Sequence, residues 1–175
     1  MGWLYQQTSV FFSRDDGSYP EICVGNLPPE QVVRAYKLIR KFCGFVVGRP
    51  RFFNREQACE MALDEIGCAA ELVTDSRAQP FHFMVRNLKF GKDWQIHELG
   101  VFVMPNAIAL DYVKGPAWGE LEIESLLVLI MLIIRNSPES FVRLEEEIPD
   151  NLKAVFRDSM LQLKDEIGDL PDPVF

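Results

Sequence analysis

Asp111 is the residue whose setting most suggests chemistry, because it is an acid at the end of an apolar stretch. It follows residues 107–110, precedes Tyr112 and stands shortly before Trp118. A carboxylate there must be exposed or accept hydrogen bonds, since burying it alone is costly. We interpret Asp111 first as a structural residue that bonds backbone N–H groups of the following loop. The alternative is a small hydrolase or transferase with a pocket near residues 111–119, where Asp111 works with His97 or a cysteine.

The two histidines and four cysteines are the other candidates for chemistry. Neither His82 nor His97 has a second ligand at a metal-binding interval, so we predict no metal site and no cofactor. His82 stands between two phenylalanines, and in a strand its ring would face away from theirs. The cysteines form no C-x-x-C pair, and we expect them to be reduced core thiols: Cys23, Cys43, Cys59 and Cys68. Neither a glycine-rich phosphate loop nor a G-x-S-x-G elbow occurs, which disfavours common nucleotide and serine-hydrolase chemistry.

The net charge of the chain favours some classes of partner over others. The chain has 26 acidic and 18 basic residues, a formal net charge of −8. This charge repels nucleic acid and anionic membranes at long range and suits a partner with a basic surface. Residues 31–55 are the exception, with seven cations and no acid. Arg34, Lys37 and Lys41 share a helical face there. We expect this face to be solvated or paired with the acidic C-terminal half, and nucleic-acid binding through residues 34–55 is the weakest hypothesis.

Helical spacing of apolar residues predicts four helices, at residues 28–43, 55–66, 117–135 and 150–167. The third includes Leu126–Ile134, which is apolar on every side, so we expect that helix to be fully buried. It is too short to span a membrane, which takes about 20 apolar residues. Asn54 and Gln57 resemble a capping box at the start of the second helix. Residues 68–73 fit either a continuation of that helix or a strand.

Aromatic and β-branched runs separated by turn residues predict antiparallel hairpins. Residues 3–12 and 19–24 should form the first hairpin. Residues 81–85 and 88–90 should be two short strands. Residues 99–104 and 107–113 should pair around Pro105-Asn106. We therefore predict a single α+β domain over residues 1–175, a mostly antiparallel sheet packed against about four helices, with a loose tail at 170–175.

The acidic charge and the lack of a catalytic motif favour a non-enzymatic protein-binding module. An immunity protein or antitoxin that masks a basic bacterial toxin fits this class by analogy. The contact should combine acidic residues with an exposed aromatic anchor. The candidate residues are Asp111, Tyr112, Trp118, Trp94, Glu145, Glu146 and Glu147. The first residues lack the basic start and long apolar stretch of a signal peptide, so we expect a cytoplasmic protein. Three tryptophans and thirteen phenylalanines leave a homodimer open.

Overall fold

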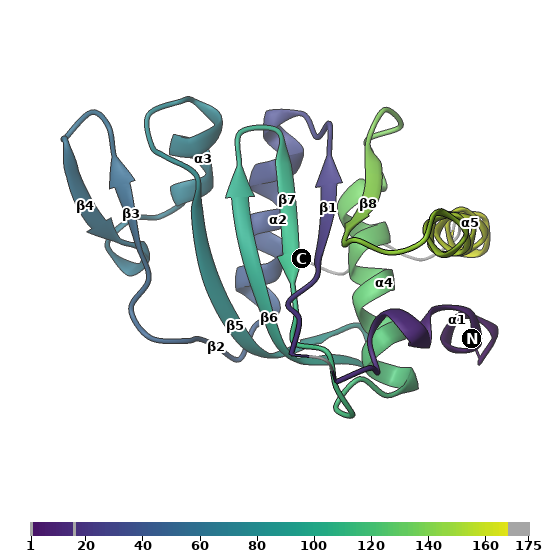
Figure 1. Ribbon diagram of the computed structural model, residues 1–175. Helices are drawn as coiled ribbons and strands as arrows, with labels where there is room; N and C mark the ends of the chain where they lie inside the picture. The colour runs from purple at the N-terminus through teal and green to yellow at the C-terminus, as the bar shows by residue number, and fades with distance from the viewer. Residues whose placement is uncertain (1, 16, 168–175) are drawn as a thin grey trace.

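A six-stranded antiparallel sheet organises the chain in the computed structural model, which describes residues 2–15 and 17–167 (Figure 1). The strand order is β2-β5-β6-β7-β1-β8. These strands are β1 Glu21–Gly25, β2 Phe45–Val46, β5 Phe81–Phe90, β6 Trp94–Met104, β7 Ala107–Asp111 and β8 Phe141–Glu145. A separate hairpin consists of β3 Arg51–Asn54 and β4 Cys59–Ala62. The predicted α+β class is confirmed; the predicted tail at 170–175 lies outside the described residues.

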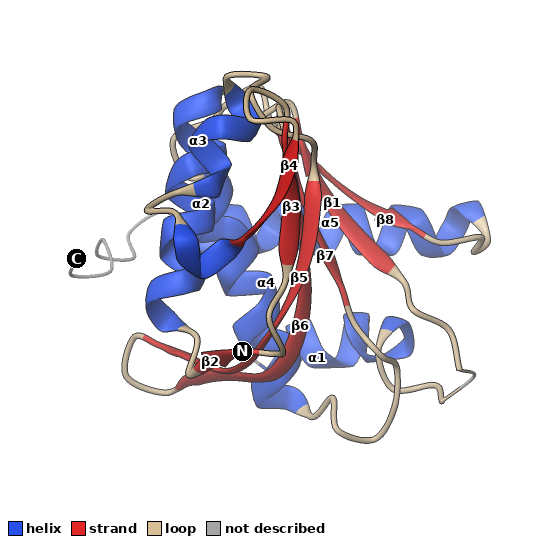
Figure 2. Ribbon diagram, turned by 90° about the vertical axis from the view of Figure 1, so that its left-hand side faces the viewer, coloured by secondary structure: helices blue, strands red, loops and turns tan. Residues whose placement is uncertain are grey.

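Helices cover one side of the sheet. The α-helices are α1 Gly2–Thr8, α2 Pro29–Phe42, α3 Ala69–Thr74, α4 Glu120–Ile134 and α5 Asp150–Ile167. Two 3₁₀ turns, η1 Ser9–Phe11 and η2 Leu63–Glu65, complete the helical segments. Figure 2 views the sheet edge-on and shows α2, α3 and α4 on its left-hand side. Helices α1 and α5 pack together beyond the β8 edge (Figure 1). Within the described chain, no helix lies over the opposite side, which we call the open face.

The core lies between the sheet and α4. All residues from Ser125 to Ile134 are buried, because α1, α2, α5 and β6 all pack against this helix. Its first turn is only partly buried: Ile123 is completely buried but Leu121 is 37% exposed, so the expected complete burial holds only for the later turns. The Ser125 hydroxyl lies within the core, where it accepts a hydrogen bond from the Gln95 N–H and donates one to the Leu121 carbonyl. None of the helices in the described ranges has the length and hydropathy of a membrane span.

The predicted opening hairpin is wrong. Residues 2–8 form α1 although their aromatic composition favours a strand, and β1 pairs with β7 and β8 instead. Docking on α5 overrides the local preference: the Trp3 indole N–H donates to Glu166, 3.1 Å away. The Ser159 hydroxyl of α5 likewise donates to the Gln7 side chain at 2.8 Å. Tertiary contacts of this kind commonly outweigh β-propensity.

The predicted helix at 55–66 is also wrong, because this segment forms the turn and second strand of the β3–β4 hairpin, followed by the short 3₁₀ turn η2. The Asn54 side chain accepts the N–H groups of Glu56 and Gln57 at 3.0 and 3.2 Å. A helix-capping residue and an Asx turn make the same side-chain-to-backbone hydrogen bonds. Asn54 therefore makes the bonds predicted for a cap, but within a hairpin turn. Residues 69–74 are helical, which settles the segment that fitted two states.

Two strands differ from expectation in a way that shapes the open face. Residues 81–90 form one strand, not two, and Asn87 has a positive φ of 54° where the two predicted strands would have been separated. Side-chain alternation changes there: His82 and Arg86 are exposed, whereas Leu88 is buried. Strand β8 was not predicted at all.

Candidate functional site

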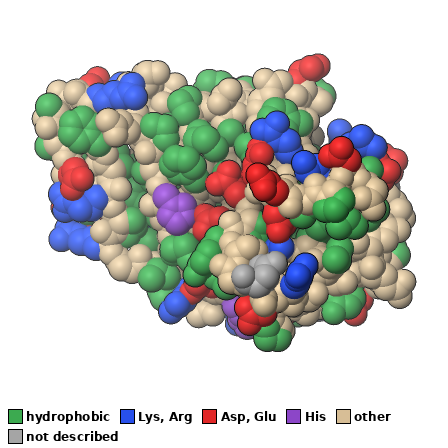
Figure 3. Space-filling model, in the orientation of Figure 1, with side chains coloured by type: hydrophobic (Ala, Val, Ile, Leu, Met, Phe, Trp, Pro, Cys, Tyr) green, Lys and Arg blue, Asp and Glu red, His purple; other side chains and the backbone are tan. Residues whose placement is uncertain are grey.

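Strand register aligns the open-face side chains in two rows. The first row runs across five strands through Met84, Gly100, Asp111, Glu21 and Glu145. The second row runs beside it through His82, Phe102, Ala109, Cys23 and Arg143. Figure 3 views this face: hydrophobic side chains gather over the upper part of the strands, next to a group of acidic side chains. The open face thus combines apolar and acidic surface.

Gly100 provides the space in which the Asp111 carboxylate lies. A Cβ at this glycine would be 2.2 Å from both Asp111 carboxylate oxygens, so an alanine would displace them. Across this gap Asp111 Oδ1 reaches His82 Nε2 at 2.7 Å, two strands away. The Asp111 hydrogen bond raises the pKa of His82, although partial burial opposes the shift. The interpretation of Asp111 is corrected here: its partner is the His82 ring, and not the N–H groups of the following loop.

Glu21 lies between two other carboxylates. Its cross-strand neighbours are Asp111 on β7 and Glu145 on β8, and we call these three residues the acidic row. Burial raises the pKa of Glu21, and repulsion from Asp111 and Glu145 raises it further. Like charges directly opposite each other destabilise a sheet. The two acids on either side of Glu21 have basic partners. Asp111 pairs with His82, and Glu145 accepts a hydrogen bond from Arg143 Nε at 2.6 Å.

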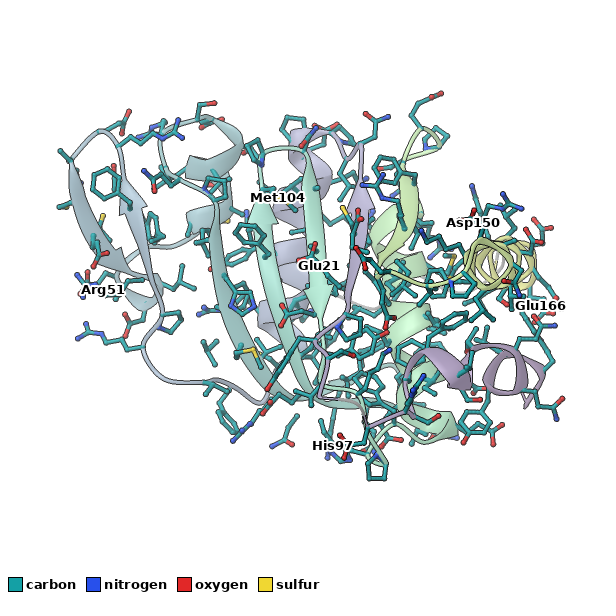
Figure 4. The ribbon with its side chains drawn as sticks, in the orientation of Figure 1. Glu21, Arg51, His97, Met104, Asp150 and Glu166 are labelled. Atoms are coloured by element: carbon teal, nitrogen blue, oxygen red, sulfur yellow. The ribbon has the colours of Figure 1, made fainter. Side chains whose placement is uncertain are left out.

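A pocket of about 480 Å³ opens beside the Met84–Asp111 part of the first row, where β7 runs into residues 112–119. We call it the loop pocket. Asp111 and Met84 belong both to its wall and to the first row, so the open face leads into it. Figure 4 labels Glu21 and Met104 on the open face and His97, another wall residue, at the lower end of the sheet.

Aromatic side chains line one wall of the loop pocket. The Trp118 ring is tilted against Phe12 and meets Tyr112 edge to face, with ring centroids 5.3 and 5.1 Å apart. Its indole N–H donates to the Val113 carbonyl at 2.7 Å. Only 7% of Trp118 is exposed, so the expectation of an exposed anchor is wrong for this residue. The Tyr112 hydroxyl donates to the Phe11 carbonyl, and burial raises the pKa of Tyr112.

Charged residues surround the same pocket. Glu98, Asp111 and Glu122 bring carboxylates to it, and Lys114 is its lysine. Only 14% of the Glu122 side chain is exposed, and its Oε1 lies 3.3 Å from His97 Nε2. The Lys114 side chain is 5% exposed and forms an ion pair with Glu146. Glu146 therefore has a structural partner, and removing it would leave a buried ammonium without that carboxylate.

The remaining predicted site residues lie in different places. Glu145 belongs to the acidic row, and Glu147 is exposed just after β8. Trp94 begins β6, where its ring packs on Phe90 with centroids 5.6 Å apart, and it does not line the loop pocket. The structure thus brings together Asp111, Tyr112 and Trp118, but not Trp94 or Glu147.

The enzyme hypothesis placed a pocket near residues 111–119, in which Asp111 works with His97 or a cysteine. The loop pocket lies at that place and has both Asp111 and His97 in its wall, so this alternative stays a prediction. Asp111 pairs with His82, while His97 pairs with Glu122. Cys23 shares a row with His82 but lies three strands away, a distance of about 14 Å. Burial and the nearby Glu145 and Glu21 raise the pKa of Cys23, which weakens it as a nucleophile. All four cysteines are unpaired, and Cys59 is exposed, contrary to the expectation of four core thiols.

The basic segment forms local ion pairs. Lys37 bonds Glu71 at 2.7 Å, and Arg51 lies 3.3 Å from Glu60. Arg49 contacts Glu65 at 2.9 Å. The partners of these three cations come from residues 60–71. Nucleic-acid binding by residues 34–55 stays a prediction, and these pairs give that surface less net positive charge than its sequence indicates.

Glu21, Gly100, Phe102 and Met104 were not among the predicted site residues. Glu21 precedes the apolar run Ile22–Val24 and alternates with it, which is a usable signal. The predicted pairing of residues 19–24 with residues 3–12 hid that signal.

No protein-family model matches the chain. Comparison of the chain with curated proteins and with solved structures also finds no match.

Proposed function

We propose that this chain is a non-enzymatic module that binds a basic protein through the open face of its sheet. The observation that carries the proposal is the acidic row beside apolar surface on a sheet face that no described helix covers. Such a surface offers complementary charge for approach and apolar area for affinity. An immunity protein or antitoxin that masks a basic toxin is a class of this kind.

Three further observations support a basic partner. The chain carries a formal charge of −8, which favours association with a cationic surface. Phe102 and Met104 are half-buried on the open face, and Phe141 at its β8 edge is 45% exposed. The basic residues near β3 and β4 contact nearby acids.

The four unpaired cysteines fit a reducing compartment, and we propose a cytoplasmic site of action.

Affinity purification of paired variants tests this proposal. The open-face variant carries Phe102→Ser and Met104→Ser, and the control carries Val155→Ser and Leu161→Ser on α5, where both side chains are exposed. Each tagged protein is expressed at native level in its own cells and purified at low salt. We expect wild type and control to retain one stoichiometric protein with a basic surface, and the open-face variant to lose it.

Several outcomes would contradict the proposal. The partner could be acidic, or the open-face variant could retain it as well as the control does. Recovery of no stoichiometric partner would also count against the proposal. Analytical ultracentrifugation of the purified chain measures its oligomeric state. If wild type is a homodimer and the open-face variant is a monomer, the open face binds a second copy of the chain and not a basic partner.

A further inference from the structure

We infer that the loop pocket receives an arginine side chain of the basic partner. The inference rests on the proposed function and adds the chemistry of one contact. Central anchors that fill a pocket supply much of the affinity of protein interfaces, and arginine is enriched among them. The loop pocket, at about 480 Å³, is large enough for such a side chain and adjoins the open face at Asp111 and Met84.

The charges of the pocket select a cation. Carboxylates come to its wall from three elements: Glu98 on β6, Asp111 on β7 and Glu122 on α4. Glu98 forms an ion pair with Arg86 of β5, whereas the partners of Asp111 and Glu122 are histidines. Lys114 is the lysine of the wall, and its Nζ is already paired with Glu146. Asp111 and Glu122 contact the histidines 82 and 97, whose side chains are 45% and 62% exposed. Those rings lie at the surface, so a bound cation can reach carboxylates that face the pocket.

The aromatic wall favours a guanidinium over a compact ammonium ion. Tyr112 and Trp118 form the inner wall, and Tyr19, which is 70% exposed, stands at the rim. A planar guanidinium stacks on aromatic faces and bonds carboxylates in a fork geometry, whereas an ammonium is more strongly hydrated. Tyr112 and Trp118 are almost completely buried, and Phe12 already stacks on the Tyr112 ring, so Tyr19 is the aromatic side chain that a guanidinium can reach. A pocket that combines the Asp111 and Glu122 carboxylates with the Tyr19 ring therefore fits arginine better than lysine.

Two small probes test this inference without the partner. Ethylguanidinium carries the arginine head group, and ethylurea is a neutral planar molecule of nearly the same shape. Each is titrated into the ¹⁵N-labelled full chain at low salt, and the indole N–H of Trp118 and the backbone amides of residues 112–119 are followed by NMR. We expect saturable shifts with ethylguanidinium, with a dissociation constant of about 10 mM, and none with ethylurea.

Matched variants locate the binding. Glu122→Gln and Asp111→Asn each remove one pocket charge and keep the shape of the side chain. We expect each to weaken ethylguanidinium binding by about fivefold. Glu60→Gln removes an equal charge from the exposed β3–β4 hairpin and should leave binding unchanged. Dispersed amide spectra establish that every variant is folded.

The inference is overturned if ethylurea binds as well as ethylguanidinium, if Glu60→Gln weakens binding as much as Glu122→Gln, or if no saturable shift occurs. Its failure is distinct from that of the proposed function. A basic partner that the open-face variant loses, together with no ethylguanidinium binding, would retain the interface and remove the pocket from it. Ethylguanidinium binding with no basic partner would retain the loop pocket as a guanidinium site and remove the proposed protein interface.

Discussion

On the packed face of the sheet, Val101, Val103 and Leu110 are completely buried against the helical layer, and their cross-strand neighbours are apolar. On the open face, the same three strands β1, β6 and β7 place Glu21 beside Asp111 and leave a glycine at position 100. One face therefore gains stability from burial, while the other places like charges side by side at a cost to stability. Such a division separates residues that hold the fold from residues available for binding.

The largest predicted difference is between matched truncations on the two faces. Leu110→Ala should lower the free energy of unfolding by about 2–5 kcal/mol, because it leaves a cavity in the core. Phe102→Ala should cost about 1 kcal/mol, since its side chain is only half-buried. Urea denaturation measures both. Equal losses would mean that the open face is part of the structural core, and the comparison would fail.

Gly100→Ala tests the gap that accommodates Asp111. The added methyl group would meet the carboxylate at 2.2 Å, so we expect a loss of about 1–3 kcal/mol. In an Asp111→Ala background the obstacle is absent and the loss should be much smaller. A double-mutant cycle by urea denaturation gives the coupling. An equal loss in both backgrounds would show that the glycine is needed for another reason.

The smallest effect concerns pH. The folded-state pKa of His82 is raised from its ordinary value of 6.5, so the folded state binds its proton more tightly. The resulting stabilisation is present below pH 6.5 and is lost as pH rises through the raised folded value. We expect less than about 1 kcal/mol, because the ring is half-exposed and its charge is screened by solvent.

The measurement compares wild type with His82→Asn by urea denaturation between about pH 5.5 and pH 8.5. Wild type should lose stability relative to the variant as pH increases. Glu21 has the same sign, because its folded-state pKa is also raised, from 4.5. His82 opposes this rise, so Glu21 contributes in both proteins and its pKa is raised further in the variant. A difference that is constant over this range, or that increases with pH, would exclude the proposed His82–Asp111 contribution.

Elements defined by their own periodicity were predictable. The amphipathic helices α2 and α5 and the β6–β7 hairpin follow from apolar spacing and turn residues, because these signals lie within the element itself. Helix α1 and the β3–β4 hairpin were mispredicted, since docking on α5 and an Asx turn decided their states. Asp111, Tyr112 and Trp118 were predicted to be neighbours because they are close in sequence. Glu21 was not, because its neighbours Asp111 and Glu145 are 90 and 124 residues away.

The position of β1 between β7 and β8 has a consequence for how the chain folds. This early strand finds its partners only after residues 107–111 and 141–145 have been synthesised. Contacts that distant in sequence slow folding and leave strand edges exposed in the meantime. During translation the β5–β6–β7 meander can assemble first, while residues 21–25 wait beside it. The same insertion that completes the acidic row therefore also completes the sheet, so we expect the proposed binding surface to form together with the folded state.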